Sequence, residues 1–276
     1  MGADDGRLVK TTSFADPEGF SKSDYGLYDV AVRSWRGCIF IHFDRSADWD
    51  EAGAFQRPPL TFQNFPMEDM RLGHIWTTVI DCNWKTFWEN FNECLHCPNV
   101  HPELVELVPL FSRRIINPKD VPDWPEYEDR KEAKYRGGMA EGGEAWSSDW
   151  SAQGNIIPSL TEEDLARGHT YCSSWPSVFM GGYPDHVRIV RMRPLGPEQT
   201  ELVAEWLFTP DTLADENYDR ENVIGFGKLV MEQDADVSVL NQKGLHAAPF
   251  EHGVLMPEEY ILKYLHEWIR ERVTAD

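Results

Sequence analysis

The chain has 276 residues, a formal net charge of −21 at pH 7, and 41% hydrophobic residues with 12% aromatic residues. This composition is that of a folded globular protein, and its acidity argues against nucleic acid or an anionic membrane surface as a partner. No apolar run is long enough to span a membrane, and the N-terminus lacks a secretory signal pattern. The five cysteines follow no disulfide framework, so free thiols and a cytoplasmic location are expected.

Short apolar and β-branched runs between turn residues predict the strands of the fold. The expected strand segments are 30–43, 74–81, one running from 170–174 into 178–180, 186–192 and 201–208. Segment 112–170 shows no sustained periodicity and is expected to cross the surface as a candidate lid. The Pro- and Gly-containing segment 193–197 is expected to be a turn between the last two strands.

Three helices are expected. The first runs from Asn83 or Trp84 to Cys97, because Asn83 can cap it and Pro98 stops it. The later two helices are expected over about 216–243, with Asp215 as cap and Gly244 after its end, and from Pro257 onward, with Ile261, Tyr264, Leu265, Trp268 and Ile269 on one face. Strands followed by long helices predict an α+β fold, in which a curved antiparallel β-sheet wraps around a long C-terminal helix (helix-grip, START-like).

His96 and His101 are a candidate pair of metal ligands. Five residues of straight helix leave two side chains about 140° out of register, so the pair converges only if the helix ends between them. Pro98 is expected to supply that break. Imidazole suits iron, zinc, copper and nickel alike, and two hydrogen-bonded histidines at a helix end are the alternative interpretation.

Asp234 is the candidate third ligand. Its helical stripe is shared with Phe226, Val230, Val237 and Asn241. The carboxylate therefore points where apolar side chains point, and a buried carboxylate needs either a cation or an ion pair. The partner is a metal, or an arginine such as Arg188 or Arg191. Asp236 lies away from this stripe and is expected at the surface.

Two segments resemble the catalytic part of the Rieske non-haem iron oxygenase α subunits, of the aromatic ring-hydroxylating dioxygenase type. Segment 83–102, N-W-K…E-N-F-N-E-C-L-H-C-P-N-V-H-P, resembles the mononuclear iron motif of that family. Segment 233–244, Q-D-A-D-V…N-Q-K-G, resembles the segment that carries the carboxylate ligand. Residues 5–9 resemble the tail of the family's iron–sulfur domain, and 193–197 also matches the family pattern.

The resemblance assigns roles to four residues. It implies that His96, His101 and Asp234 bind one mononuclear Fe(2+), and that Glu93 is the electron-transfer bridge to a neighbouring subunit's cluster. Aromatic residues on the predicted strands are candidates for a substrate pocket, with ordinary core packing as the alternative. These are Phe179, Tyr183 and Trp206, together with Trp175 and Phe208.

The sequence also departs from the family pattern. The iron–sulfur domain of the family carries a C-x-H motif followed by C-x2-H, and this chain does not contain that pair of motifs. Cys94 and Cys97 form a lone C-x2-C and are expected to be packing thiols, while Leu95 stands where many relatives have tyrosine. A 2Fe-2S cluster is therefore expected only in a missing domain or partner. Residues 1–44 are interpreted as a remnant or linker after a missing Rieske domain, with the first strands, and 45–276 as the mononuclear iron catalytic domain.

The implied function is that of an oxygenase component that uses Fe(II) and O2 to hydroxylate an aromatic or other small organic substrate. Its electrons would come from a Rieske cluster outside this chain. A quaternary-amine or O-demethylating monooxygenase is the alternative within the family. A hydrophobic-ligand-binding helix-grip module and a hydrolytic zinc site are alternatives from other classes. Expected partners are a small-molecule substrate, O2, a reductase or ferredoxin and, at full length, a homotrimer, with neither nucleic acid nor a membrane.

Overall fold

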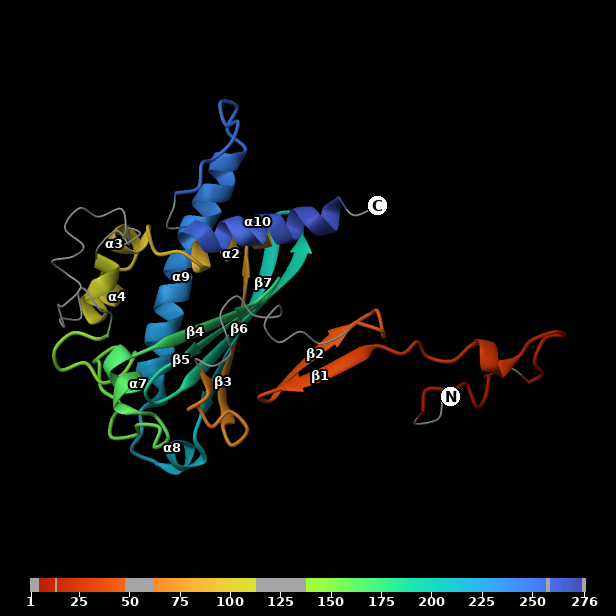
Figure 1. Cartoon of the computed structure of the whole chain (residues 1–276), viewed down its shortest axis with the longest axis horizontal. Helices are drawn as coiled ribbons and strands as arrows, with labels where there is room; N and C mark the ends of the chain where they lie inside the picture. The colour runs from red at the N-terminus through yellow and green to blue at the C-terminus, as the bar shows by residue number, and fades with distance from the viewer. Residues whose placement is uncertain (1–4, 13, 48–61, 113–137, 257–258, 275–276) are drawn as a thin grey trace. The chain divides into compact units, whose positions relative to one another are not determined.

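The computed structural model describes residues 5–12, 14–47, 62–112, 138–256 and 259–274. The chain divides into two compact units, Met1–Asp50 and Glu51–Asp276 (Figure 1). The first unit contains the short helix η1 (Lys22–Asp24) and the antiparallel pair β1 (Ala31–Trp35) and β2 (Cys38–His42). Its turn residues Arg36 and Gly37 both have positive φ, 45° and 82°, as a two-residue hairpin requires. The predicted strand segment 30–43 therefore forms two strands joined at Arg36 and Gly37.

The second unit is built on a five-stranded antiparallel sheet of order β3-β7-β6-β5-β4. Its strands are β3 (Arg71–Ile80), β4 (Thr170–Ser174), β5 (Val178–Gly182), β6 (Val187–Gly196) and β7 (Gln199–Phe208). All five lie in segments that were predicted to be strand, but the single strand expected from 170–174 into 178–180 is two antiparallel strands, β4 and β5. The predicted turn over 193–197 is wrong in part, because β6 continues to Gly196 and its pairing with β7 shifts register between Pro194 and Gly196.

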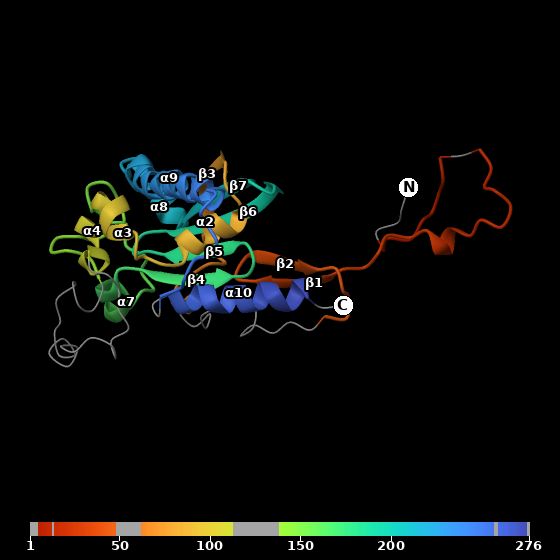
Figure 2. The same cartoon turned by 90° about the horizontal axis from the view of Figure 1, so that it is seen from above.

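Helices surround this sheet (Figures 1 and 2). They are α2 (Trp84–Phe91), α3 (Cys97–Val100), α4 (Pro102–Leu107), η3 (Pro109–Ser112), α7 (Glu162–Arg167), α8 (Pro210–Ala214), α9 (Arg220–Leu245) and α10 (Tyr260–Val273). The short helices α7 and α8 were not predicted, because their few residues show no helical periodicity of apolar side chains. No helix of the described residues has the length and apolarity needed to cross a membrane.

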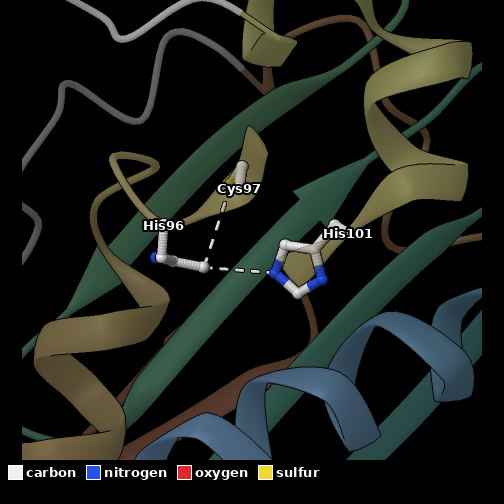
Figure 3. Close-up of side chains that lie close together, drawn as sticks. All are labelled: His96, Cys97 and His101. Atoms are coloured by element: carbon white, nitrogen blue, oxygen red, sulfur yellow. Dashed lines mark hydrogen bonds between the residues drawn. The ribbon is translucent and has the colours of Figure 1, made fainter. Parts of the chain in front are cut away.

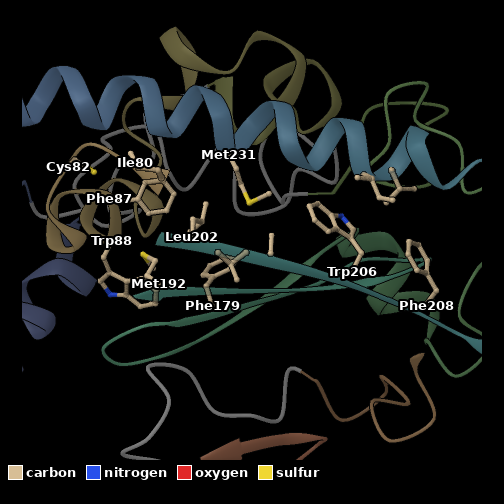
Figure 4. Packing of buried hydrophobic residues seen from close by; sticks show 14 of the residues in the cluster. Ile80, Cys82, Phe87, Trp88, Phe179, Met192, Leu202, Trp206, Phe208 and Met231 are labelled. Carbon is tan, nitrogen blue, oxygen red and sulfur yellow. The ribbon is translucent and has the colours of Figure 1, made fainter. Parts of the chain in front are cut away.

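The main core lies between α9 and one face of the sheet. Alternate residues of β7 are buried, as the period of two in a half-buried strand requires, and they include Leu202 and Trp206. Met231 of α9 is fully buried opposite them. Figure 4 shows this methionine between the helix and the strands. The predicted antiparallel sheet packed against a long helix is therefore observed.

Two helix boundaries differ from the prediction. The helix α2 is capped by Asn83, whose side chain accepts a hydrogen bond from the backbone of Lys85, but it ends at Phe91 instead of Cys97. Pro98 does not stop that helix; it occupies the first turn of α3, where a missing N–H costs nothing.

The long helix also begins later than predicted. Asp219, rather than Asp215, accepts the capping hydrogen bond of α9, and the helix continues through Gly244. In α10, Tyr264 is exposed, whereas Leu262 and Leu265 are buried. The apolar face of this helix is therefore displaced by part of a turn from the predicted face. The predicted start at Pro257 lies outside the described residues.

Candidate metal centre

The single-turn helix α3 places a histidine at each of its ends. His96 is the N-cap residue and His101 the C-cap residue. The α2 helix has already ended at Phe91, so the chain can turn back before His96 is reached. As predicted, a helix ends between the two histidines: α3 stops at Val100, and His101 leaves the helical conformation with φ −119° and ψ 69°. Pro98 starts this turn and does not end it.

Three donor atoms from α3 and α9 meet at one point. His96 Nε2 lies 3.1 Å from His101 Nε2, and Asp234 Oδ1 lies 3.2 Å from the first nitrogen and 3.1 Å from the second. Figure 3 shows the two imidazole rings approaching each other. His101 and Asp234 are almost completely buried, with relative exposures of 1% and 3%. The fold thus brings Asp234 to the two histidines, although it lies more than 130 residues from His101 in the sequence.

The size of this triangle fits one first-row metal ion. With metal–ligand bonds of about 2.1 Å, donors at 90° to each other are about 3.0 Å apart, and donors at tetrahedral angles about 3.4 Å apart. The edges of 3.1–3.2 Å lie between these two values, so the triangle has the size of a single-ion site. Two imidazoles and one carboxylate on one face of an octahedron form the facial triad of non-haem Fe(II) oxygenases.

The Nδ1 atom of each imidazole is hydrogen-bonded to a further side chain. His96 Nδ1 is 2.5 Å from Glu93 Oε1, and the other oxygen of Glu93 accepts a hydrogen bond from the backbone N–H of Leu95. His101 Nδ1 is 2.8 Å from Gln233 Oε1, and Gln233 Nε2 donates to Glu103 at 2.9 Å. Because both acceptors face Nδ1, that nitrogen carries the proton and each Nε2 lone pair is free to bind a metal.

The Asp234 carboxylate is paired within this site rather than with an arginine. Asn90 Nδ2 donates to Asp234 Oδ1 at 2.6 Å, alongside the two histidines. Arg191 instead pairs with Glu205 on the sheet surface, and Arg188 contacts Asp234 in no ion pair among the described residues. The arginine alternative is therefore wrong.

The buried stripe of α9 follows a spacing of four rather than the mixed spacing predicted. Phe226, Val230 and Asp234 are buried as expected, and the stripe continues through Ser238 and Gln242. Val237 is only half-buried and Asn241 is exposed, which corrects the predicted stripe. Asp236 is exposed, as expected.

The pKa values of His96 and Asp234 depend on each other. Burial of the His96 ring lowers its pKa, but hydrogen bonds and charges from Asp234 and Glu93 outweigh this effect and raise the pKa to about 9. Burial raises the pKa of Asp234, while hydrogen bonds and charge from His101 and His96 lower it more, so its pKa falls below the usual value. Without a metal, the pair is therefore charged at neutral pH.

This raised pKa predicts a loss of stability of the metal-free chain at alkaline pH. Folding favours the protonated form of His96. The contribution of this protonation to the free energy of unfolding is therefore fully present below pH 6.5 and is lost as the pH rises through about 9. Each pH unit in this window contributes up to about 1.4 kcal/mol. Urea titrations of the metal-free chain at pH 6.5 and 9.5 measure it. A His96→Gln variant should show a flatter pH profile, and an equally steep profile would contradict the assignment.

Cys94 and Cys97 form a disulfide. The prediction that they are packing thiols is therefore wrong. Cys97 Sγ lies 3.8 Å from His96 Nε2, so its position alone would allow it to join His96 and His101 as a ligand (Figure 3). The thiolate is the metal-binding form of cysteine, and a disulfide sulfur is not a thiolate. The donor set is thus two imidazoles and one carboxylate.

A cavity of about 230 Å³ opens beside the three donors. Its aromatic lining residues are Phe91, Phe111, Trp146, Tyr171, Phe179 and Tyr260. Of the predicted pocket residues, Phe179 lines this cavity. Tyr183 and Trp206 do not; Tyr183 is buried behind the cavity and Trp206 belongs to the core between sheet and helix, which corrects both predictions. Trp175 and Phe208 are not among the lining residues either.

The aromatic rings of the cavity form a continuous wall. Neighbouring ring centroids are 4.7 Å apart for Phe91 and Phe179, 5.1 Å for Phe179 and Tyr171, and 6.3 Å for Tyr171 and Trp146. Phe111 extends the wall beyond Trp146. Trp146 was not predicted because its segment has no periodicity. Tyr171 lies on a predicted strand but was not named as a pocket residue.

Comparisons with known proteins identify relatives. A family model described as the ring hydroxylating alpha subunit (catalytic domain) matches residues 67–275. The chain is 26% identical over 275 residues to the glycine betaine monooxygenase oxygenase subunit of Chromohalobacter salexigens, covering 90% of this chain and 59% of that protein. It is 29% identical over 102 residues to the carnitine monooxygenase oxygenase subunit of Escherichia coli K12, covering 36% of this chain and 26% of that protein.

Solved structures share the fold. A quaternary ammonium Rieske monooxygenase, studied for carnitine oxidation, matches with a TM-score of 0.64 at 16% identity, over 97% of this chain and 68% of that chain. A complex of such an enzyme with its substrate γ-butyrobetaine matches with a TM-score of 0.63 at 17% identity, over 98% and 68%. The chain spans less than two thirds of the length of the glycine betaine relative.

Proposed function

The chain belongs to the family of ring hydroxylating alpha subunits, and from this premise we propose that it binds one Fe(II) and oxidises a quaternary amine. The observation that carries the iron site is the triangle of donor atoms from His96, His101 and Asp234. Bound there, ferrous iron would supply the activation of O2. The protein would orient both imidazoles through Glu93 and Gln233 and hold the carboxylate in place through Asn90.

The quaternary-amine substrate is favoured over an aromatic ring by the relatives. Both named relatives are monooxygenases of quaternary amines, so the initial preference for aromatic hydrocarbons and dioxygenation receives less support. The aromatic wall from Phe91 to Trp146 also suits a cation, because aromatic faces attract quaternary ammonium groups. An aromatic wall alone would accept a ring substrate too, so the preference for an amine rests on the relatives.

The reaction class follows from the chemistry of an amine. One oxygen atom of O2 would enter a C–H bond next to the quaternary nitrogen, and the other would leave as water with two electrons and two protons. The hydroxylated carbon would then release the nitrogen as a tertiary amine and become an aldehyde, with loss of one proton.

The alternatives from other classes fit the site less well. A carrier of apolar ligands would gain nothing from a buried carboxylate beside two imidazoles, a set that is costly to bury. A hydrolytic zinc site is not supported by the relatives, which are monooxygenases.

The family resemblance supports the remaining assignments. We assign 45–276 to the catalytic domain with a helix-grip arrangement, supported by the packing of α9 on the sheet, and 1–44 to a linker with the first strands. Electrons would come from a 2Fe-2S cluster of a Rieske domain or partner through Glu93, with a reductase or ferredoxin as donor. The assembly would be a homotrimer.

Product analysis tests the substrate class. The Fe(II)-loaded chain is given hydrogen peroxide, which brings both the oxygen and the electrons, with glycine betaine, carnitine or γ-butyrobetaine. We expect a tertiary amine and an aldehyde, measured by mass spectrometry, and no product from an Asp234→Ala control. Naphthalene serves as the competing substrate. A diol from naphthalene without amine products would contradict the quaternary-amine proposal.

A further inference from the structure

The cavity contains a buried cation that no carboxylate of the described residues neutralises. Arg188 of β6 lines the cavity and is only 4% exposed. Its guanidinium donates to the Tyr183 hydroxyl at 2.9 Å and to the Gly227 carbonyl at 3.3 Å. Its Nε is buried without a hydrogen-bond partner among the described residues, none of which forms an ion pair with Arg188.

Such an arrangement is costly unless a ligand completes it. A buried charge is tolerated when it is paired and hydrogen-bonded. A guanidinium has five N–H donors in a planar fork that matches a carboxylate. Within the described part of the chain, the Arg188 guanidinium makes two hydrogen bonds, to Gly227 and to Tyr183. We therefore expect the unused N–H donors of Arg188 to bind an anion in the cavity.

A second unused donor lies nearby. Trp146 lines the same cavity, and its indole N–H is buried without a partner among the described residues. The ring of Trp146 is 4.8 Å from the ring of Tyr183, and the Arg188 guanidinium carbon is 5.5 Å from that same ring. Arg188 and Trp146 thus both contact Tyr183 and both line the cavity.

The distance to the metal centre sets the size of the ligand. Arg188 is anchored at Gly227, seven residues before Asp234 on α9. Seven residues of helix rise about 10 Å. The aromatic wall connects Trp146, which packs on Tyr183 beside Arg188, with Phe91, which is next to the Asp234 partner Asn90. A small molecule with an anion at one end could therefore place its other end at the metal centre.

We propose that Arg188 and Trp146 form a carboxylate-binding subsite, which selects zwitterionic substrates with a carboxylate at one end and a quaternary ammonium group at the other. The ammonium group would lie on the aromatic wall near the metal centre. The part of this proposal that concerns the ammonium group rests on the proposed function, whereas the carboxylate subsite rests on the unpartnered donors of the cavity.

Calorimetric titration with three probes of one shape tests the subsite. γ-Butyrobetaine carries both charges, its primary amide lacks the carboxylate, and 5,5-dimethylhexanoate lacks the ammonium charge. The full chain, anaerobic and with Fe(II), should bind the amide about 10- to 100-fold more weakly than γ-butyrobetaine, the range of a charged hydrogen bond. Equal affinities of the wild-type chain for these two probes would overturn the subsite even if no variant folded.

Variants separate a binding role from a structural one. Arg188→Gln should lose most of its affinity for γ-butyrobetaine and keep its affinity for the amide within about threefold, with Trp146→Phe showing a smaller effect in the same direction. Arg191→Gln is the matched control, because Arg191 lies on the same strand and pairs with Glu205 at the surface. A folded Arg188→Gln chain that loses both probes equally would also overturn the subsite.

The third probe distinguishes the two proposals. If 5,5-dimethylhexanoate binds as tightly as γ-butyrobetaine, while the amide binds weakly, the carboxylate subsite stands and the quaternary-amine proposal fails. If the amide binds as tightly as γ-butyrobetaine and 5,5-dimethylhexanoate binds weakly, the amine proposal stands and the subsite fails.

Discussion

Asp234→Ala is expected to reduce bound iron from about one ion per chain to a small fraction, because it removes one of three donor atoms and the only charged one. Changes in residues that merely orient a ligand cost about 10- to 100-fold in metal affinity, so loss of a ligand should cost more than about 100-fold. Metal analysis after gel filtration, with competition by a chelator of known affinity, measures both the stoichiometry and the affinity.

Asp236→Ala is the matched control for this experiment. Asp236 lies two residues further along the same helix and is exposed, so its replacement should leave the iron content unchanged. Circular dichroism of both variants checks that α9 is intact. An Asp234→Ala chain that is folded and still holds one iron per chain would remove Asp234 from the site and leave the proposed triad without its carboxylate.

The sheet and the long helix could be predicted because their signals are local. A period of two in β7 and an apolar stripe on α9 are each written within one segment, and burial at Asp234 followed from that stripe. The end of α2 could not be placed as well. Pro98 is a strong local signal, but a proline is equally suited to the first turn of a new helix, and the chain uses it there.

The surroundings of the donors could not be derived from local signals. Gln233 reaches His101, and Asn90 reaches Asp234, across more than 130 residues of sequence. Trp146 lies in a segment without periodicity, yet it contributes an indole N–H to the cavity. Contacts of this kind depend on tertiary packing, which single-segment patterns do not encode. The triad and Glu93 were named through the family resemblance, and Phe179 as an aromatic residue of a predicted strand.

Glu93→Gln is expected to leave most of the iron in place at saturating Fe(II) and to lower turnover with the natural electron donor by about 10- to 100-fold. The carboxylate of Glu93 accepts from both His96 Nδ1 and the Leu95 backbone N–H. A glutamine of the same shape has a single acceptor oxygen, so one of these two donors loses its partner. The negative charge at the proposed electron entry also disappears.

Three measurements distinguish electron transfer from simple positioning. Turnover with hydrogen peroxide needs no electron donor, so it should fall much less than donor-driven turnover. In the metal-free chain, nuclear magnetic resonance should show a lower pKa of His96, because the charge of Glu93 helps to raise it. Glu103→Gln is the matched control, since Glu103 stands behind the other histidine through Gln233 and has no proposed part in electron entry. Donor-driven turnover of Glu93→Gln at the level of this control would reject the bridging role, because a carboxylate that only orients an imidazole can be replaced by any comparable acceptor.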